Sequence, residues 1–335
     1  MNILKKLLLR WEVVLFLILI LVNVFNAFNS PYYLSLNGLL DATRDFLDKS
    51  FIVFPMAMII LMGEIDISVG ATVALSSVIM GVSYNAGQGI PMVAAIILCL
   101  VIGSVCGLIN GLILTKFKEL SPMIVTLATM TIYRGTAYII LEDQAAGKFP
   151  AWFQEFGWGT VGPVPYALIV FAILAVIFTI ILNKTMLGRR IYAIGSNRTA
   201  STFSGIKVAR IRILAYTLAG TMAGLTAIFL TSRMSSTRPN IGYSYELDII
   251  TMVVLGGIST SGGKGRLSGA LISIFIIGFL KYGLGLNNIS SQLLMVIIGL
   301  LLIISVLTPN LVSQYKRWHL SRKGRRHLPA RPDQN

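Results

Sequence analysis

The sequence predicts an all-α, polytopic membrane protein, and its composition and long apolar stretches are the observations that predict it. Hydrophobic residues make up 55% of the chain and charged residues 12%, with a mean hydropathy of +0.79. A soluble domain carries about 25% charged residues. Because apolar stretches take up most of the 335 residues, we expect a single membrane-spanning domain over residues 1–335.

About ten transmembrane helices are expected, some of them broken or short. A helix needs about 20 apolar residues to cross the hydrocarbon core of a bilayer. Seven stretches come close to that length, at about 12–28, 91–115, 121–141, 165–182, 212–231, 267–286 and 292–308. Three shorter stretches, at about 51–62, 69–84 and 247–258, are bounded by glycine or acidic residues and are expected to form broken or tilted spans.

The uneven distribution of Lys and Arg sets the expected orientation. With ten crossings and both termini in the cytoplasm, 21 of the 28 basic residues lie on the inner side and five on the outer side, as the positive-inside rule requires. The largest basic groups are a loop at about 183–212 and a cytoplasmic tail at about 310–335. This asymmetry, with anionic membrane lipid as the partner, accounts for the net charge of +15, so we expect no nucleic-acid partner.

Residues that commonly carry catalysis or bind metals are scarce. Cys99 and Cys106 lie on one predicted span without metal-ligand spacing around them, and both histidines lie in the basic tail. The glycine run at 256–265 fails the Walker A pattern, because Lys264 is followed by Gly265 instead of Ser or Thr. We expect no catalytic, cofactor-binding or metal-binding residue in this chain.

One acidic pattern leaves a membrane enzyme open as an alternative. Asp41, Asp45 and Asp48 have the spacing by which membrane prenyltransferases hold magnesium and a diphosphate. Such enzymes need a second acidic cluster, and Arg44 and Lys49 balance the charge of this one. A solvated outer loop is therefore the expected structure of this stretch.

The segment Gly63-Glu-Ile-Asp-Ile-Ser-Val-Gly70 places two acids between glycines and between uncharged apolar runs. An ionisable group at the centre of a transmembrane helix costs about 2.5–3.5 kcal/mol or more, which makes both acids functional candidates. Asp66 is also placed to cap the helix that follows. A second break, after Asp248–Ile258, strengthens the comparison with transporters, whose broken helices line a substrate cavity. The candidate residues of a translocation path are Glu64, Asp66, Ser68, Asn110, Tyr133 and Arg134, with interhelical hydrogen bonding as the alternative role of the last three.

The inner loop at about 183–212 is expected to contain a short helix. Asn197 supplies an N-cap, Arg198–Ser204 is long enough for two turns, and Gly205 supplies the C-terminal stop. With Ile191, Ile194 and Phe203 as its apolar residues, this loop suits docking into a groove on another protein, and contact with lipid is the alternative. The candidate docking residues are Arg190, Gly195, Asn197, Arg198, Phe203 and Gly205.

Three well-separated segments carry a family likeness: Gly63 to Gly70, the run from Gly188-Arg-Arg-Ile to Phe-Ser-Gly-Ile206, and Val254-Leu-Gly-Gly-Ile-Ser-Thr-Ser-Gly-Gly-Lys-Gly265. Together they resemble the permease subunits of bacterial monosaccharide ABC importers, in the branch that carries ribose, xylose, rhamnose and autoinducer-2. The loop that begins at Lys184 is similar to the family's coupling helix, which sits in a cleft of the ATP-binding subunit. Glu64 departs from the family, where glycine or another small residue is expected.

The resemblance implies a non-enzymatic permease subunit of the bacterial plasma (inner) membrane that crosses it several times. It implies a second permease copy or paralogue, two cytoplasmic ATP-binding subunits that bind ATP and Mg, and an extracytoplasmic sugar-binding protein. The aromatic outer loop at 142–163 would face that protein or mark the membrane interface. An ion- or proton-coupled secondary transporter that uses Glu64 and Asp66 is the alternative.

Overall fold

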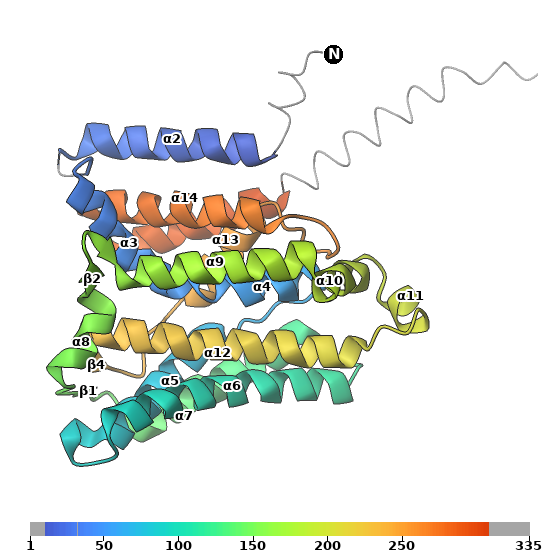
Figure 1. The fold of residues 1–335 in the computed structure, drawn as a ribbon, viewed down its shortest axis with the longest axis horizontal. Coiled ribbons are helices and arrows are strands. Elements are labelled where there is room, and N and C mark those ends of the chain that lie inside the picture. Colours follow the sequence, from blue (N-terminus) through green and yellow to red (C-terminus); the bar gives the residue numbers. More distant parts are fainter. Residues whose placement is uncertain (1–10, 32, 308–335) are drawn as a thin grey trace, which may run out of the picture.

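Long helices that run side by side form the structure, a computed structural model that describes residues 11–31 and 33–307 (Figure 1). In this part of the chain, seven helices are long and apolar enough to cross a membrane. They are α2 (Trp11–Asn29), α5 (Val69–Tyr84, continued by the 3-10 turn η1, Asn85–Gly87), α6 (Met92–Lys116), α7 (Pro122–Leu141), α9 (Tyr166–Lys184), α12 (Val208–Met234) and α14 (Leu267–Leu286).

The predicted fold class is confirmed, although the number of long helices differs from ten. Six of the seven long predicted stretches match these helices, and the stretch at about 69–84 also becomes one with η1. The other predicted spans are the shorter helices α4 (Val53–Leu61), α13 (Tyr245–Leu255) and Ser291–Leu307. At about 1.5 Å per residue, α4 and α13 extend only about 14 and 17 Å, too little to cross alone. Residue 308 and the tail at 310–335 lie outside the described residues.

The stretch expected to be a solvated outer loop is helix α3 (Leu36–Ser50). The prediction was wrong because ion pairs with distant residues hold this stretch against the bundle: Asp48 is buried and pairs with Arg233 at 3.1 Å, and Lys49 pairs with Asp248 at 2.9 Å. Asp41 and Asp45 are exposed. Among the described residues, no group of three or more His, Cys, Asp or Glu is placed to hold a metal ion.

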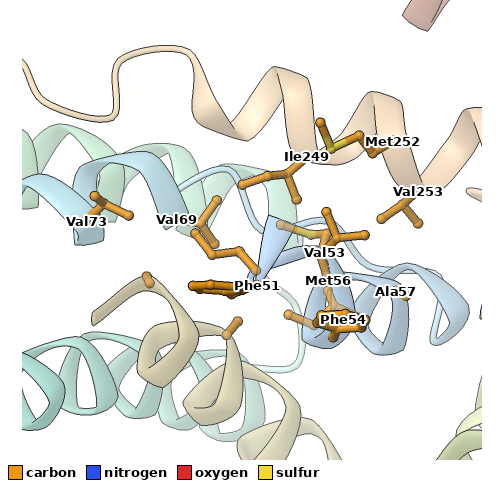
Figure 2. Close-up of a cluster of buried hydrophobic side chains, with 14 of the residues drawn as sticks. Phe51, Val53, Phe54, Met56, Ala57, Val69, Val73, Ile249, Met252 and Val253 are labelled. Carbon is orange, nitrogen blue, oxygen red and sulfur yellow. The ribbon is translucent and has the colours of Figure 1, made fainter. Parts of the chain in front are cut away.

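The two short helices α4 and α13 lie at the centre of the bundle. All nine residues of α4 are buried, as expected of a helix that is apolar on every side. Figure 2 shows Val53 and Met56 of α4 near Ile249 of α13, with Phe51 and Val69 completing the same apolar cluster. The interrupted segments of the two halves of the chain therefore share one core.

Helices α6 and α12 are in direct backbone contact along a seam of glycines. A Cβ atom on Gly103 would come within 2.3 Å of the Gly220 carbonyl oxygen, and one on Gly107 within 2.1 Å of the Tyr216 carbonyl oxygen. Small residues allow such close approach in membrane bundles. The seam holds these two long helices together as one unit.

The two ends of the bundle carry different short elements. At one end lie α8 (Ala151–Trp158) and two small antiparallel pairs, β1 (Ala146–Gly147) with β4 (Ser236–Thr237) and β2 (Thr160–Val161) with β3 (Val164–Pro165) (Figure 1). At the opposite end lie α10 (Met186–Ser196) and the projecting α11 (Arg198–Phe203). The predicted orientation makes the α10–α11 end cytoplasmic.

Candidate functional site

The break between α4 and α5 begins with a glycine turn. Gly63 has a φ of +79°, and its backbone N–H donates to the Ile60 carbonyl, while that of Glu64 donates to the Ile59 carbonyl. This pair of bonds is the Schellman arrangement that closes a helix at a left-handed residue. The chain then runs without helical structure until α5 begins at Val69.

Asp66 closes the turn that leads into α5. Its Oδ1 atom accepts hydrogen bonds from the backbone N–H of Ser68 at 2.9 Å and from the Ser68 hydroxyl at 2.7 Å. Both residues are buried. The carboxylate therefore lies just before the helix start, where the positive end of the helix dipole stabilises negative charge. Ser68, and not Asp66, occupies the N-cap position, and no side chain caps α5.

A chain of buried hydrogen bonds continues from Ser68 into α6 and α7. The side-chain amide of Asn110 donates to the Ser68 hydroxyl at 2.8 Å, and the Tyr133 hydroxyl donates to the Cys106 carbonyl at 3.0 Å and lies 3.4 Å from the Asn110 side-chain oxygen. Four of the six candidate path residues thus form one network. Its members are buried within a single chain, so this arrangement holds the break against two long helices, and a role in the translocation path stays a prediction.

Arg134 lies apart from that network. Its Nη1 atom donates to the backbone carbonyls of Pro239 and Ile241, both at 2.7 Å. Arg134 therefore ties α7 to the segment between β4 and α13. These two carbonyls belong to no strand or helix. Irregular backbone inside a membrane protein needs hydrogen-bond partners of this kind.

Glu64 lies in a second cluster, on the side of the break toward α11. Its carboxylate accepts from Arg212 Nε at 2.7 and 3.0 Å and from Arg198 Nη1 at 2.9 Å. Arg212 also donates to the Leu114 carbonyl at the end of α6. One carboxylate therefore joins the break to α11 and to α12.

The sequence did not reveal these ion pairs. Glu64 lies 134 residues from Arg198 and 148 residues from Arg212, and no spacing rule relates positions that far apart. The sequence offered two signals: basic residues are concentrated in the loop at about 183–212, and Glu64 is an acid at a position where the resemblance implies a small residue. The pairing explains how an ionised carboxylate is tolerated there, since a buried charge requires a partner.

The projecting helix α11 follows the local prediction closely. Asn197 caps it by accepting a hydrogen bond from the backbone N–H of Ala200 at 2.9 Å, and Gly205 follows its end with a φ of +79°. Phe203 is 88% exposed and Arg190 is exposed. The apolar surface differs from the expected one, however, because Ile191 and Ile194 are buried in α10 against the bundle. Phe203 is left as the large apolar side chain of α11.

Three backbone segments meet at the C-terminal end of α10, in what we call the glycine junction: Leu61–Gly63, Gly195–Ser196 and Gly262–Gly263. The backbone N–H of Gly263 donates to the Leu61 carbonyl at 2.8 Å. A Cβ atom on Gly195 would lie 1.8 Å from the same carbonyl oxygen, and one on Gly262 would lie 2.9 Å from the Gly195 oxygen. Gly195 thus belongs to α10, where its role is close packing, and α10 contacts the end of α4 and the loop that follows α13 through main-chain atoms.

Tyr192 gives α10 a further contact with the glycine run. Its hydroxyl donates to the Gly265 carbonyl at 3.0 Å. Burial raises the pKa of this hydroxyl, and the positive charge of Arg266 opposes that rise. The group therefore remains a neutral donor at physiological pH, and α10 is fixed to the loop after α13 by a side chain as well as by the glycine junction.

Comparison with known proteins places this architecture in a family. The family described as branched-chain amino acid transport system / permease component matches residues 39–306. The ribose import permease protein RbsC of Bacillus subtilis is 43% identical over 295 residues, which cover 88% of this chain and 89% of that protein. The autoinducer 2 import system permease protein LsrD of Yersinia enterocolitica is 35% identical over 304 residues (88% and 90%), and that of Escherichia coli is 34% identical over 330 residues (95% and 98%).

No solved structure matches this chain. The relatives cover nearly its whole length, and the seven long apolar helices agree with a multi-pass protein of the bacterial plasma membrane. The resemblance seen in the three sequence segments is confirmed. The chain belongs to the permease family of bacterial sugar ABC importers that includes the ribose and autoinducer 2 permeases.

Proposed function

We propose that this protein is the permease subunit of an ABC importer that moves a monosaccharide or a similar small polar solute into the cell. The names of its relatives, which import ribose and autoinducer 2, support this substrate class. The complex would contain a second copy or a close relative of this chain, two cytoplasmic ATP-binding subunits and an extracytoplasmic sugar-binding protein. ATP and Mg are assigned to the ATP-binding subunits.

The observation that carries the proposal is the connection between α11 and the core. Phe203 projects from α11 with 88% of its surface exposed, as a side chain that inserts into a partner's cleft must. The adjoining α10 touches the end of α4 and the loop that follows α13 at the glycine junction. A partner that displaces α11 therefore acts on both interrupted segments at once.

This connection supports a transport cycle. Closure of the ATP-binding subunits would move α10 and α11 and shift α4 and α13 between inward-open and outward-open arrangements of the paired permeases, a rigid-body change of the kind that packed helices undergo. A monosaccharide carries no charge, so transient hydrogen bonds would suffice to pass it along. Broken segments supply such groups, because their backbone is not fully paired within helices.

The ion-coupled alternative requires carboxylates that can bind and release a cation. Glu64 is instead held by two guanidinium groups, and Asp66 accepts two hydrogen bonds from Ser68. These contacts favour the importer. The gene neighbourhood provides an inexpensive check, since genes for an ATP-binding subunit and a sugar-binding protein beside this one support the importer.

The decisive experiment is uptake by the reconstituted complex. The chain would be co-purified with its ATP-binding and sugar-binding partners, placed in proteoliposomes and supplied with labelled ribose, xylose, rhamnose or autoinducer-2. We expect ATP-dependent uptake of one of these solutes that requires the binding protein. Uptake that follows an ion gradient without ATP would contradict the proposal and support the secondary transporter.

A further inference from the structure

Glu64 holds two arginines that differ in their contact with solvent. The side chains of Glu64 and Arg212 are each 4% exposed, whereas that of Arg198 is 44% exposed. Arg212 belongs to the first turns of α12, and Arg198 is the first residue of α11. The carboxylate therefore has one buried partner on a long helix and one accessible partner on the projecting helix.

The buried partner is fixed by more than the carboxylate. Arg212 contacts both oxygens of Glu64 and also donates to the Leu114 carbonyl of α6. Helices α6 and α12 are themselves in backbone contact along their glycine seam. If Arg198 moves away, Glu64 thus keeps a guanidinium partner and is not left as an isolated buried charge.

The accessible partner has space in which to move. Arg198 lines a cavity of about 560 Å³ together with Thr115, Lys118, Thr202, Ile206, Lys207, Val208, Ala209 and Arg210. The other charged groups in this lining are all basic. Glu64 attracts Arg198, whereas the basic side chains that line the cavity repel it. A displacement of α11, which carries Arg198, therefore changes the distance between Arg198 and Glu64.

We propose that Glu64 and Arg198 form a latch, in which Arg198 acts as a positioning residue that keeps the segment Gly63–Ser68 in step with α11. The inference rests on the proposed function. While it is closed, the latch transmits movement of α11 with the ATP-binding subunits to the start of α5. When it opens, Glu64 keeps its pairing with Arg212. The glycine junction contacts the break through backbone atoms of Leu61–Gly63, and the latch adds a side-chain connection from the next residue, Glu64, on the way to α5.

The test compares Arg198→Gln with two matched variants in the complete reconstituted complex. Arg198→Lys keeps the charge, and Arg210→Gln removes a neighbouring positive charge that makes no ion pair among the described residues. The measured quantity is solute taken up per ATP hydrolysed, with labelled ribose or whichever solute of the panel the wild-type complex transports. We expect Arg198→Gln to lower this ratio about two- to fivefold, the range that a half-exposed ion pair supports, while Arg198→Lys lowers it less and Arg210→Gln leaves it unchanged.

Ionic strength provides a readout that a purely structural role would not change. Salt screens an exposed pair, so the wild-type ratio should fall as salt is raised, whereas that of Arg198→Gln is already low and should not fall further. An unchanged ratio in Arg198→Gln, or an equal loss in Arg210→Gln, would overturn the latch while leaving the importer in place. A wild-type complex that does not couple ATP hydrolysis to uptake would overturn the proposed function, and the latch with it.

Discussion

Single charged and polar residues in this protein act by joining segments that are distant in the sequence. Glu64 and Arg212 are buried together, so the stability of each depends on the other. Asn110 is fully buried and bridges Ser68 to the region of Tyr133. These contacts stabilise the break between α4 and α5, and substitutions can separate that role from contact with the transported solute.

Removal of Arg212 should be far more damaging than removal of Arg198. Arg212→Gln leaves Glu64 with only the exposed half of its pairing, and breaking a buried pair costs about 3–5 kcal/mol. Arg198→Gln should cost about 0–1 kcal/mol, as exposed pairs do. Thermal unfolding of the two variants in detergent measures the difference, and equal melting temperatures would show that the burial of Glu64 carries no such dependence.

Asn110→Ala separates a structural role from a path role. The substitution removes the hydrogen bond to the Ser68 hydroxyl, while Ser68 keeps Asp66 and Tyr133 keeps the Cys106 carbonyl as partners, so we expect a loss of about 0.5–1.5 kcal/mol in stability. The KM for the transported solute should stay at its wild-type value. A changed KM at unchanged stability would instead place Asn110 on the translocation path.

At the scale of elements, the glycine seam between α6 and α12 offers a matched pair of substitutions. A Cβ atom on Gly107 would meet the Tyr216 carbonyl oxygen at 2.1 Å, whereas one on Gly135 of α7 would meet nothing within 4 Å. Gly107→Val should therefore lower stability by about 1–3 kcal/mol or more, and Gly135→Val should have little effect. Similar yields of folded protein from both variants would argue against close packing at the seam.

The glycine junction beneath α10 can be tested in the same way. Gly195→Val forces α10 away from the Leu61 carbonyl, which a Cβ atom would approach to 1.8 Å. We expect this variant to reach the membrane and retain its ATP-binding partners while its ATP hydrolysis no longer drives uptake. Gly135→Val is again the control, because a Cβ atom there would meet nothing within 4 Å. Coupled uptake by Gly195→Val would contradict this role.

The elements predicted well from the sequence are those set by local composition. Long apolar runs gave six of the long helices, and Asn197 with Gly205 gave α11, because caps and hydropathy act over a few residues. Helix α3 was missed because its charges resemble those of a solvated loop until Arg233, far along the chain, is seen to pair with Asp48. The Glu64 cluster and the glycine junction depend on contacts between distant segments, which one sequence does not encode in any visible pattern.

At the scale of the whole molecule, the distribution of basic residues assigns the α10–α11 end to the cytoplasm. Phe203 of α11 and Trp158 of α8 belong to elements at opposite ends of the bundle (Figure 1), and single cysteines there would replace exposed side chains. A membrane-impermeant maleimide should label Trp158→Cys in intact cells and Phe203→Cys only in inside-out vesicles. The native Cys99 and Cys106 are buried and should give no background. Labelling of both variants from one side would refute the predicted orientation.

The glycine junction also determines how substitutions are tolerated. Its contacts are made by main-chain atoms, so they do not depend on which side chains the exposed neighbouring positions carry, whereas Gly195, Gly262 and Gly263 have no room for a Cβ atom. A saturation library selected for solute uptake would show these three positions as intolerant beside exposed positions that accept many residues. Two paralogous permeases could then diverge in most of their side chains and still respond together to the same partners, because the backbone that receives the movement would be identical in both.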